Sequence, residues 1–312
     1  MSDAASHGPK AWLLYAFATT ILWGLWGAFT DLPAQHGFPE TLVYCVWSAT
    51  MILPALYVLA RSGWRLDRDL RAITYGMIIG LLGAGGQMLL FYALRIGPAY
   101  LVFPVISLSP MVTIALSYLL LGERTNGVGT AGIVLALLAL PLFDFSFQGF
   151  SPGSGVGWFL LSLIVMGSWG VQAFFMKVAN RDMGAESIFF YMMVTGVMLA
   201  PVAWAMTDFS QPINWGADGP YLAAGIQLLN AIGALTLVYA FRYGQAIVVS
   251  PLTNAGAPLM TAVISLLVIG TLPGRLKLVG LVLACIAAVL LAIAPEEATP
   301  AAAKTNPIAS GR

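Results

Sequence analysis

Ten long stretches of apolar residues, interrupted by few charges, take up most of this chain. A helix of about 20 apolar residues crosses the hydrocarbon core of a bilayer, so each stretch can form one span. Of the 312 residues, 59% are hydrophobic and 9% are charged, whereas a soluble domain has roughly 25% charged residues. The sequence therefore predicts an all-α polytopic membrane protein with ten transmembrane helices. The predicted helices cover residues 12–30, 41–60, 72–94, 99–121, 127–143, 157–178, 187–206, 221–241, 246–269 and 278–294.

The second half of the chain repeats the first. Residues Phe91–Gly97 match Val238–Gly244, and Trp26-Gly27 is paired with Trp169-Gly170. Each copy holds five predicted helices, and an odd number makes the second copy enter the membrane from the opposite face. We therefore expect two inverted five-helix repeats, related by a pseudo-two-fold axis in the membrane plane.

The repeats divide the chain into five parts. We expect an N-terminal tail at 1–11, a first repeat at 12–143, a loop at 144–156, a second repeat at 157–294 and a C-terminal tail at 295–312. The C-terminal tail is polar and rich in Ala, Pro and Thr, a composition typical of disorder.

Positive charge predicts the orientation. Of the 14 Lys and Arg residues, only Arg95, Arg275 and Lys277 fall on the face opposite the N-terminus. Short cytoplasmic loops carry the excess of positive residues in membrane proteins. We therefore expect a multi-pass protein of the plasma (inner) membrane with both termini in the cytoplasm.

Two proline-bounded segments stand at equivalent positions, Pro104–Pro110 and Pro251–Pro258. Proline lacks an N–H and its ring clashes with the carbonyl four residues earlier, so we expect both helices to be interrupted. Interrupted helices at matching positions of two halves point to the binding site of a transporter. The second segment is the more polar, and we expect the ninth helix to move more than the fourth. The residues predicted to break helices or to act at a gate are Pro104, Pro110, Pro251, Pro258, Arg95 and Arg242.

Aromatic and amide side chains recur at helical spacing on several predicted helices. Lipid offers no hydrogen-bond partner, so these faces should point into the bundle or toward water. They could line a solute cavity, or they could pack and hydrogen-bond between helices. We expect the Gly76 and Gly80 face to form a close helix contact. The predicted substrate-binding residues are Trp23, Trp26, Gln87, Ser107, Trp169, Gln172, Gln227, Asn230 and Asn254.

The middle of every predicted helix lacks an ionisable residue. The only histidines are His7 and His36, and no metal-binding or nucleotide-binding motif occurs, so we expect no enzyme, no cofactor and no metal. The net charge of +1 gives no field for nucleic acid. Cys45 and Cys285 lie in apolar segments, as small core residues do. A neutral aromatic cavity suits a neutral or zwitterionic solute.

These features resemble the drug/metabolite transporter superfamily, EamA type, over roughly Trp12 to Ala294. The resemblance rests on Tyr92–Arg95, on the Pro104–Pro110 segment and on Leu121–Arg124, which reads Leu-Gly-Glu-Arg. The second copy departs from this pattern, because Ile269–Arg275 lacks the glutamate. The resemblance implies a cavity lined by helices one, three, four, six, eight and nine.

The function expected from this resemblance is a carrier that moves a small metabolite by alternating access, as an exporter or exchanger. One alternative is a lipid or polyprenyl-carrier flippase, in which Arg95 and Arg242 would meet headgroup phosphates. Another is a membrane sensor or scaffold. The expected partners are a small solute and the lipid bilayer. The sequence leaves open the solute, the direction, ion coupling and whether the chain forms a homodimer.

Overall fold

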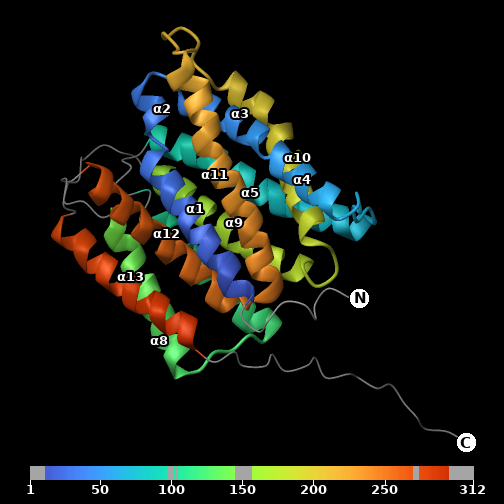
Figure 1. The fold of residues 1–312 in the computed structure, drawn as a ribbon, viewed down its shortest axis with the longest axis vertical. Helices are drawn as coiled ribbons and strands as arrows, with labels where there is room; N and C mark the ends of the chain where they lie inside the picture. Colours follow the sequence, from blue (N-terminus) through green and yellow to red (C-terminus); the bar gives the residue numbers. More distant parts are fainter. Residues whose placement is uncertain (1–10, 97–101, 103–104, 145–156, 270–273, 295–312) are drawn as a thin grey trace, which may run out of the picture.

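The computed structural model describes residues 11–96, 102, 105–144, 157–269 and 274–294, and every regular element in these ranges is helical (Figure 1). Nearly all of the predicted tails and the 144–156 loop, together with Pro104, lie outside the described residues. The helices of the first half are α1 (Ala11–Phe29), α2 (Leu32–Gln35), α3 (Glu40–Thr50), α4 (Ile52–Arg61), α5 (Leu70–Ile96), α7 (Ser109–Leu116), the π-helix η1 (Ser117–Leu121) and α8 (Gly127–Asp144). Those of the second half are α9 (Gly157–Ala179), α10 (Ala185–Ala205), the π-helix η2 (Ala217–Tyr221), α11 (Leu222–Tyr243), α12 (Ala246–Ile269) and α13 (Arg275–Ile293).

The described helices account for the ten predicted spans. Seven segments are long and apolar enough to cross a membrane, and two shorter apolar ones are Ser109–Leu121 and Gly127–Leu142. Helix α12 forms the remaining predicted span, with the predicted bounds. Helices α3 and α4 together form the second span, with Met51 at their junction. The predicted all-α fold is confirmed.

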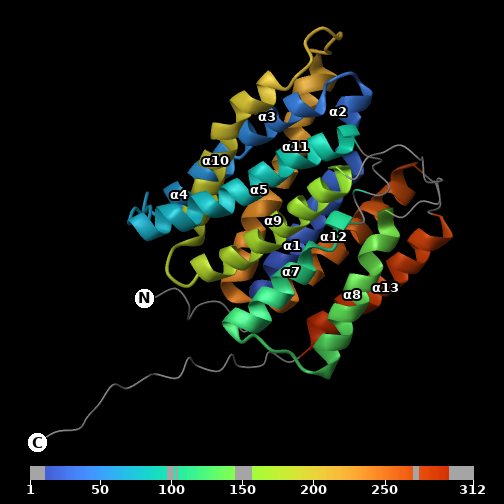
Figure 2. The ribbon, with the colours of Figure 1, turned by 180° about the vertical axis from the view of Figure 1, so that it is seen from behind.

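The packing of the helices follows the inverted repeat. Helix α1 packs on α11 and α12, and α9, its counterpart, packs on α5 and α7. Helix α3 contacts α11 and α10, while α10 contacts α5 and α3. Figure 2 shows α8 beside α13 at one edge of the bundle and α4 and α10 at the other. The first helix of each repeat is thus packed on the other repeat, so the halves interlock.

One pair of helices breaks this symmetry. Helix α12 packs along α13, but α7 makes no comparably extensive contact with its sequence neighbour α8 among the described residues. Helix α7 packs instead on α9 and α12. Among the described residues, the fourth and fifth spans are therefore in closer contact in the second half than in the first.

The two proline segments also differ. Residues Ser107 and Leu108 form a turn before α7, and Pro110 lies in the first turn of that helix, where a missing N–H costs nothing. The interruption predicted at Pro251 and Pro258 is not observed, because α12 continues through both.

Polar side chains of α12 hydrogen-bond to its own backbone beside Pro251. Thr253 Oγ1 donates to the carbonyls of Val249 at 2.9 Å and Ser250 at 3.2 Å. The carbonyl that Pro251 leaves without its helical donor is that of Ile247, four residues earlier, so these bonds lie next to the freed group and do not replace its partner. Among the described residues, only the first copy is interrupted.

Candidate functional site

The tryptophans of α1 lie on α11. Trp23 Nε1 donates to the Asn230 carbonyl at 3.3 Å, and Trp26 Nε1 donates to Gln227 Oε1 at 3.1 Å. The Trp23 ring lies against Gly233, where an added Cβ would be 2.4 Å from Trp23 Cδ1. The structure thus brings four of the predicted binding residues into one contact between the halves.

Trp47 belongs to the same cluster, and sequence reasoning missed it. Trp47 Nε1 donates to Asn230 Oδ1 at 2.8 Å, and its ring lies 5.2 Å from that of Tyr44, centroid to centroid. The signal was present, because Tyr44, Trp47 and Met51 recur at helical spacing in the second span. The Asn230 side chain therefore accepts a hydrogen bond from α3, while its backbone carbonyl accepts one from α1.

Helix α9 makes the matching contact on α5. Trp169 Nε1 donates to the Gly83 carbonyl at 3.3 Å, and a Cβ added at Gly86 would lie 2.6 Å from Trp169 Nε1. A Cβ added at Gly83 would lie 2.2 Å from Gln172 Nε2. Gln87 is half-buried one residue beyond Gly86. Glycine is thus required on α5 for the aromatic and amide side chains of α9 to approach.

These contacts correct the register of the repeat. Trp23-Gly24 is the structural counterpart of Trp169-Gly170, because both indoles donate to the third helix and lie on equivalent glycines. The sequence pairing of Trp26-Gly27 with Trp169-Gly170 is wrong by three residues. The corrected offset is the one that relates Glu40 to Glu186. A short Trp-Gly match occurs by chance in a Trp-rich chain, whereas the three-dimensional contacts do not.

Two threonines support this corrected register. Thr113 Oγ1 on α7 donates to the Gly170 carbonyl at 3.0 Å, and Thr261 Oγ1 on α12 donates to the Gly24 carbonyl at 3.0 Å. A Cβ added at Gly24 would lie 2.3 Å from Met260 Cβ. The same close contact therefore occurs on both sides of the pseudo-two-fold axis.

The two sides of the site nonetheless differ in chemistry. Gln227 and Asn230 on α11 stand where α5 has Gly80 and Gly83. On α11 an amide side chain accepts a hydrogen bond from a tryptophan indole, as Gln227 does from Trp26. On α5 the indole of Trp169 donates to a glycine carbonyl, that of Gly83.

Four amide groups have N–H donors to offer. Among the described residues, no hydrogen bond is donated by the side-chain N–H of Gln87, Gln172, Gln227 or Asn230. An amide carries two such donors, and none of these four amide nitrogens is among the fully buried polar atoms without a partner, so each remains accessible. The site can therefore donate to a polar solute.

The remaining predicted residues stand apart from this cluster. Asn254 Nδ2 donates to the Ser250 carbonyl of its own helix at 2.9 Å, and Ser107 is half-buried in the turn before α7. Arg242 Nη1 donates to the Met183 carbonyl at 3.3 Å and so ties the end of α11 to the segment before α10. The side chains of Arg95 and Pro258 lie outside the described part of the structure.

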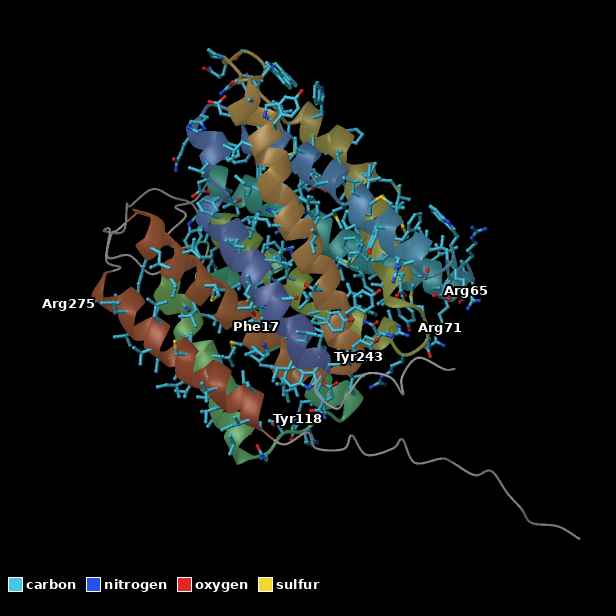
Figure 3. All side chains as sticks on the ribbon, in the orientation of Figure 1. Phe17, Arg65, Arg71, Tyr118, Tyr243 and Arg275 are labelled. Atoms are coloured by element: carbon cyan, nitrogen blue, oxygen red, sulfur yellow. The ribbon has the colours of Figure 1, made fainter. Side chains whose placement is uncertain are left out.

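Two charged side chains, Glu123 and Lys177, bind backbone groups at one end of the bundle. Glu123 is 1% exposed, and its Oε2 accepts from the Ile247 N–H, at the start of α12, at 3.0 Å. Lys177 Nζ donates to the carbonyls of Phe241, at 3.0 Å, and Gly244. The α11–α12 junction is thus held from both sides. In Figure 3, Tyr118 and Tyr243 mark this end of the bundle and Arg275 marks the other.

The electrostatics of Glu123 follow from its burial, which raises the pKa of its carboxyl in the segment that follows η1. The Ile247 N–H and the Lys177 charge oppose that rise in pKa. Sequence reasoning placed Glu123 in the Leu-Gly-Glu-Arg motif without a role, and it missed Lys177. The glutamate makes the helix-end contact.

Comparison with known proteins agrees with this architecture. Residues 10–143 and 156–293 each match the EamA-like transporter family. Protein RarD of Streptomyces exfoliatus is 25% identical over 265 residues, 81% of this chain and 77% of that protein. The pseudopaline exporter CntI of Pseudomonas aeruginosa is 28% identical over 198 residues, 62% of this chain and 66% of that protein.

A protein of known crystal structure has the same fold. It superposes with a TM-score of 0.77 over 91% of this chain and 98% of its own, at 18% identity. The family matches, one in each half, cover most of the chain and coincide with the two sets of five spans. The chain is a multi-pass membrane protein and belongs to the EamA-like transporter family.

Proposed function

We propose that this transporter carries a small neutral or zwitterionic metabolite, such as an amino acid or a nucleoside, across the plasma membrane. The observation that carries the proposal is the pair of equivalent tryptophans, Trp23 and Trp169, each of which joins one half of the molecule to the other beside amide donors. Two inverted repeats with a site between them are the architecture of alternating access.

The chemistry of the cluster favours this solute class. Amide N–H groups can bind a carboxylate or a ring oxygen, and tryptophan faces attract an ammonium group. The middle of each span lacks a charged side chain, so a strongly charged solute would find no partner there. Outward transport or exchange is the direction we propose, since the similar CntI is an exporter.

A two-step experiment tests the proposal. The purified protein is first screened by thermal shift against neutral amino acids and nucleosides. The solute that stabilises it is then radiolabelled, and its flux is measured in reconstituted vesicles. We expect Trp169→Ala and Asn230→Ala to lower flux strongly.

Trp204→Ala is the matched control, because Trp204 on α10 is 50% exposed at the surface of the bundle. That variant should transport like the wild type. Wild-type flux in Trp169→Ala and Asn230→Ala would contradict the assigned site. If no neutral amino acid or nucleoside stabilised the protein or were transported into the vesicles, the proposed solute class would be contradicted.

A further inference from the structure

The gap between α7 and α8 forms an apolar groove of about 380 Å³. It lies within membrane-spanning segments and opens outward, since Leu119 is 73% and Met111 50% exposed. The groove is lined by Met111, Ile114, Ala115, Tyr118, Leu119 and Leu137. These are all apolar side chains except for one tyrosine ring, so the groove offers a hydrocarbon chain contact along its length.

The groove exists because the repeats differ. In the second half α12 packs along α13. In the first half α7 lies on α9 and α12, and the π-helix η1 at Ser117–Leu121 carries Tyr118 and Leu119 at the end of the groove. A single π-helical turn within a helix is frequently found at functional sites.

A cation stands at the end of this groove. The Arg124 guanidinium lies 3.5 Å from the centroid of the Tyr118 ring, and Arg124 Nη1 donates to the Tyr118 carbonyl at 3.4 Å. Gly122, with φ of 68°, turns the chain back after η1 and so brings the arginine over the ring. Arg124 is exposed, and a guanidinium has five N–H donors, so most of them point away from Tyr118.

We propose that this groove binds an anionic phospholipid, with one acyl chain along α7 and η1 and the headgroup phosphate on Arg124. The ligand must be apolar along the groove from Met111 to Leu119 and negative at one end, and a membrane phospholipid has both properties. Arginine binds phosphate through paired N–H donors. Arg124 also lies on the face that the charge pattern predicts to be cytoplasmic, where anionic lipids are concentrated. This site is separate from the tryptophan cluster. The proposal does not depend on which solute the protein carries.

Native mass spectrometry of the purified protein in detergent tests the proposal. The probes are phosphatidylglycerol and phosphatidylcholine with identical acyl chains. We expect phosphatidylglycerol to bind more tightly, and Arg124→Gln to weaken its binding by about fivefold, the factor that one surface arginine contributes toward anionic lipid. Phosphatidylcholine binding should change little in that variant.

Two tryptophan variants test the groove itself. Ala115→Trp fills it and should reduce binding of both lipids. Val263→Trp is the matched control, because Val263 is 41% exposed at the equivalent position of α12. Equal binding by the two tryptophan variants would place the lipid elsewhere. Equal affinity of the wild type for the two lipids, or no change in Arg124→Gln, would overturn the headgroup assignment. Thermal unfolding of each variant confirms that it is folded.

Discussion

Glu123 Oε2 accepts a hydrogen bond from the Ile247 N–H at 3.0 Å, so a carboxylate of the first repeat caps the ninth span, which belongs to the second. A helix N-terminus carries partial positive charge and exposes amide donors, which makes it a favourable place for an acid. The equivalent residue of the second repeat is Thr271, so the sequence provides this acid at one face of the membrane only.

Two substitutions of Glu123 distinguish its role as a hydrogen-bond acceptor from the effect of its charge. Glu123→Gln keeps an oxygen that accepts from Ile247 N–H, whereas Glu123→Ala removes the acceptor and should lower stability by roughly 1 kcal/mol, the usual cost of a lost N-cap. Thermal unfolding in detergent at neutral pH measures both. Equal melting temperatures for the alanine variant and the wild type would contradict the capping role.

The difference in stability between the wild type and Glu123→Gln should depend on pH. Burial raises the pKa of Glu123 above its ordinary value of 4.5, so the folded protein binds this proton more tightly than the unfolded chain. The resulting stability is present below that ordinary value and is lost as pH rises through the higher folded value. We expect the wild type, compared with Glu123→Gln, to lose stability as pH rises above 4.5. If the melting temperatures of the wild type and Glu123→Gln changed in parallel from pH 4 to 8, Glu123 would not titrate in that range.

Gly80 of α5 should be intolerant of alanine. A Cβ at Gly80 would lie 2.4 Å from Thr195 Oγ1 and 3.1 Å from Met192 Cα, and backbone must then shift. Overpacking of this kind costs typically 1–3 kcal/mol, so Gly80→Ala should melt at a lower temperature. Gly225→Ala is the control, because nothing lies within 4 Å of its added Cβ and alanine favours a helix. That variant should be at least as stable as the wild type.

The two threonine contacts should be equivalent in energy. Thr113→Val and Thr261→Val each remove one hydroxyl donor to a glycine carbonyl and keep the side-chain shape. We expect each to lower stability by about 1 kcal/mol, the usual net value of one hydrogen bond. Melting of the single and double variants measures this. A large difference between the two singles would show that the repeats do not share this interface.

Trp47 should act on solute affinity. Trp47→Phe keeps an aromatic ring and removes the N–H that fixes Asn230 Oδ1. The Asn230 amide is then free to rotate, and we expect the KM for flux of the stabilising solute to rise by about 2- to 10-fold, which corresponds to 0.5–1.5 kcal/mol. Trp204→Phe controls for loss of an indole at the surface. An unchanged KM in Trp47→Phe would remove Trp47 from the binding site.

The spans could be predicted from the sequence because hydropathy and length act locally. The apolar run at 246–269 coincides with α12 to the residue. The break predicted at Pro251 is wrong, because a proline removes one hydrogen bond of the helix and the packing of α12 on α1, α8 and α13 can outweigh that loss. The Gly76 and Gly80 contact was expected from the small-residue spacing, and its partners on α10 are Tyr191 and Thr195.

The site was predictable in composition and less so in arrangement. Trp23, Trp26, Gln227 and Asn230 were chosen as polar or aromatic residues inside spans, and they meet across α1 and α11. Their pairing depends on which helix of one repeat packs on the other, and periodicity within one helix carries no such information. Lys177 was missed because its reach to the carbonyls of Phe241 and Gly244 depends on that same packing.

The exchange of first helices between repeats has a consequence for biogenesis. Helix α1 is synthesised well before its partners α11 and α12, which begin at Leu222 and Ala246. The N-terminal span must therefore remain in the bilayer, without its final neighbours, until most of the chain has been made. Its Thr19 hydroxyl contacts the Gly233 carbonyl and also lies 2.9 Å from the Tyr15 carbonyl one turn back, a partner within α1 itself. A helix whose polar side chains can hydrogen-bond to its own backbone is suited to staying in the bilayer without neighbouring helices.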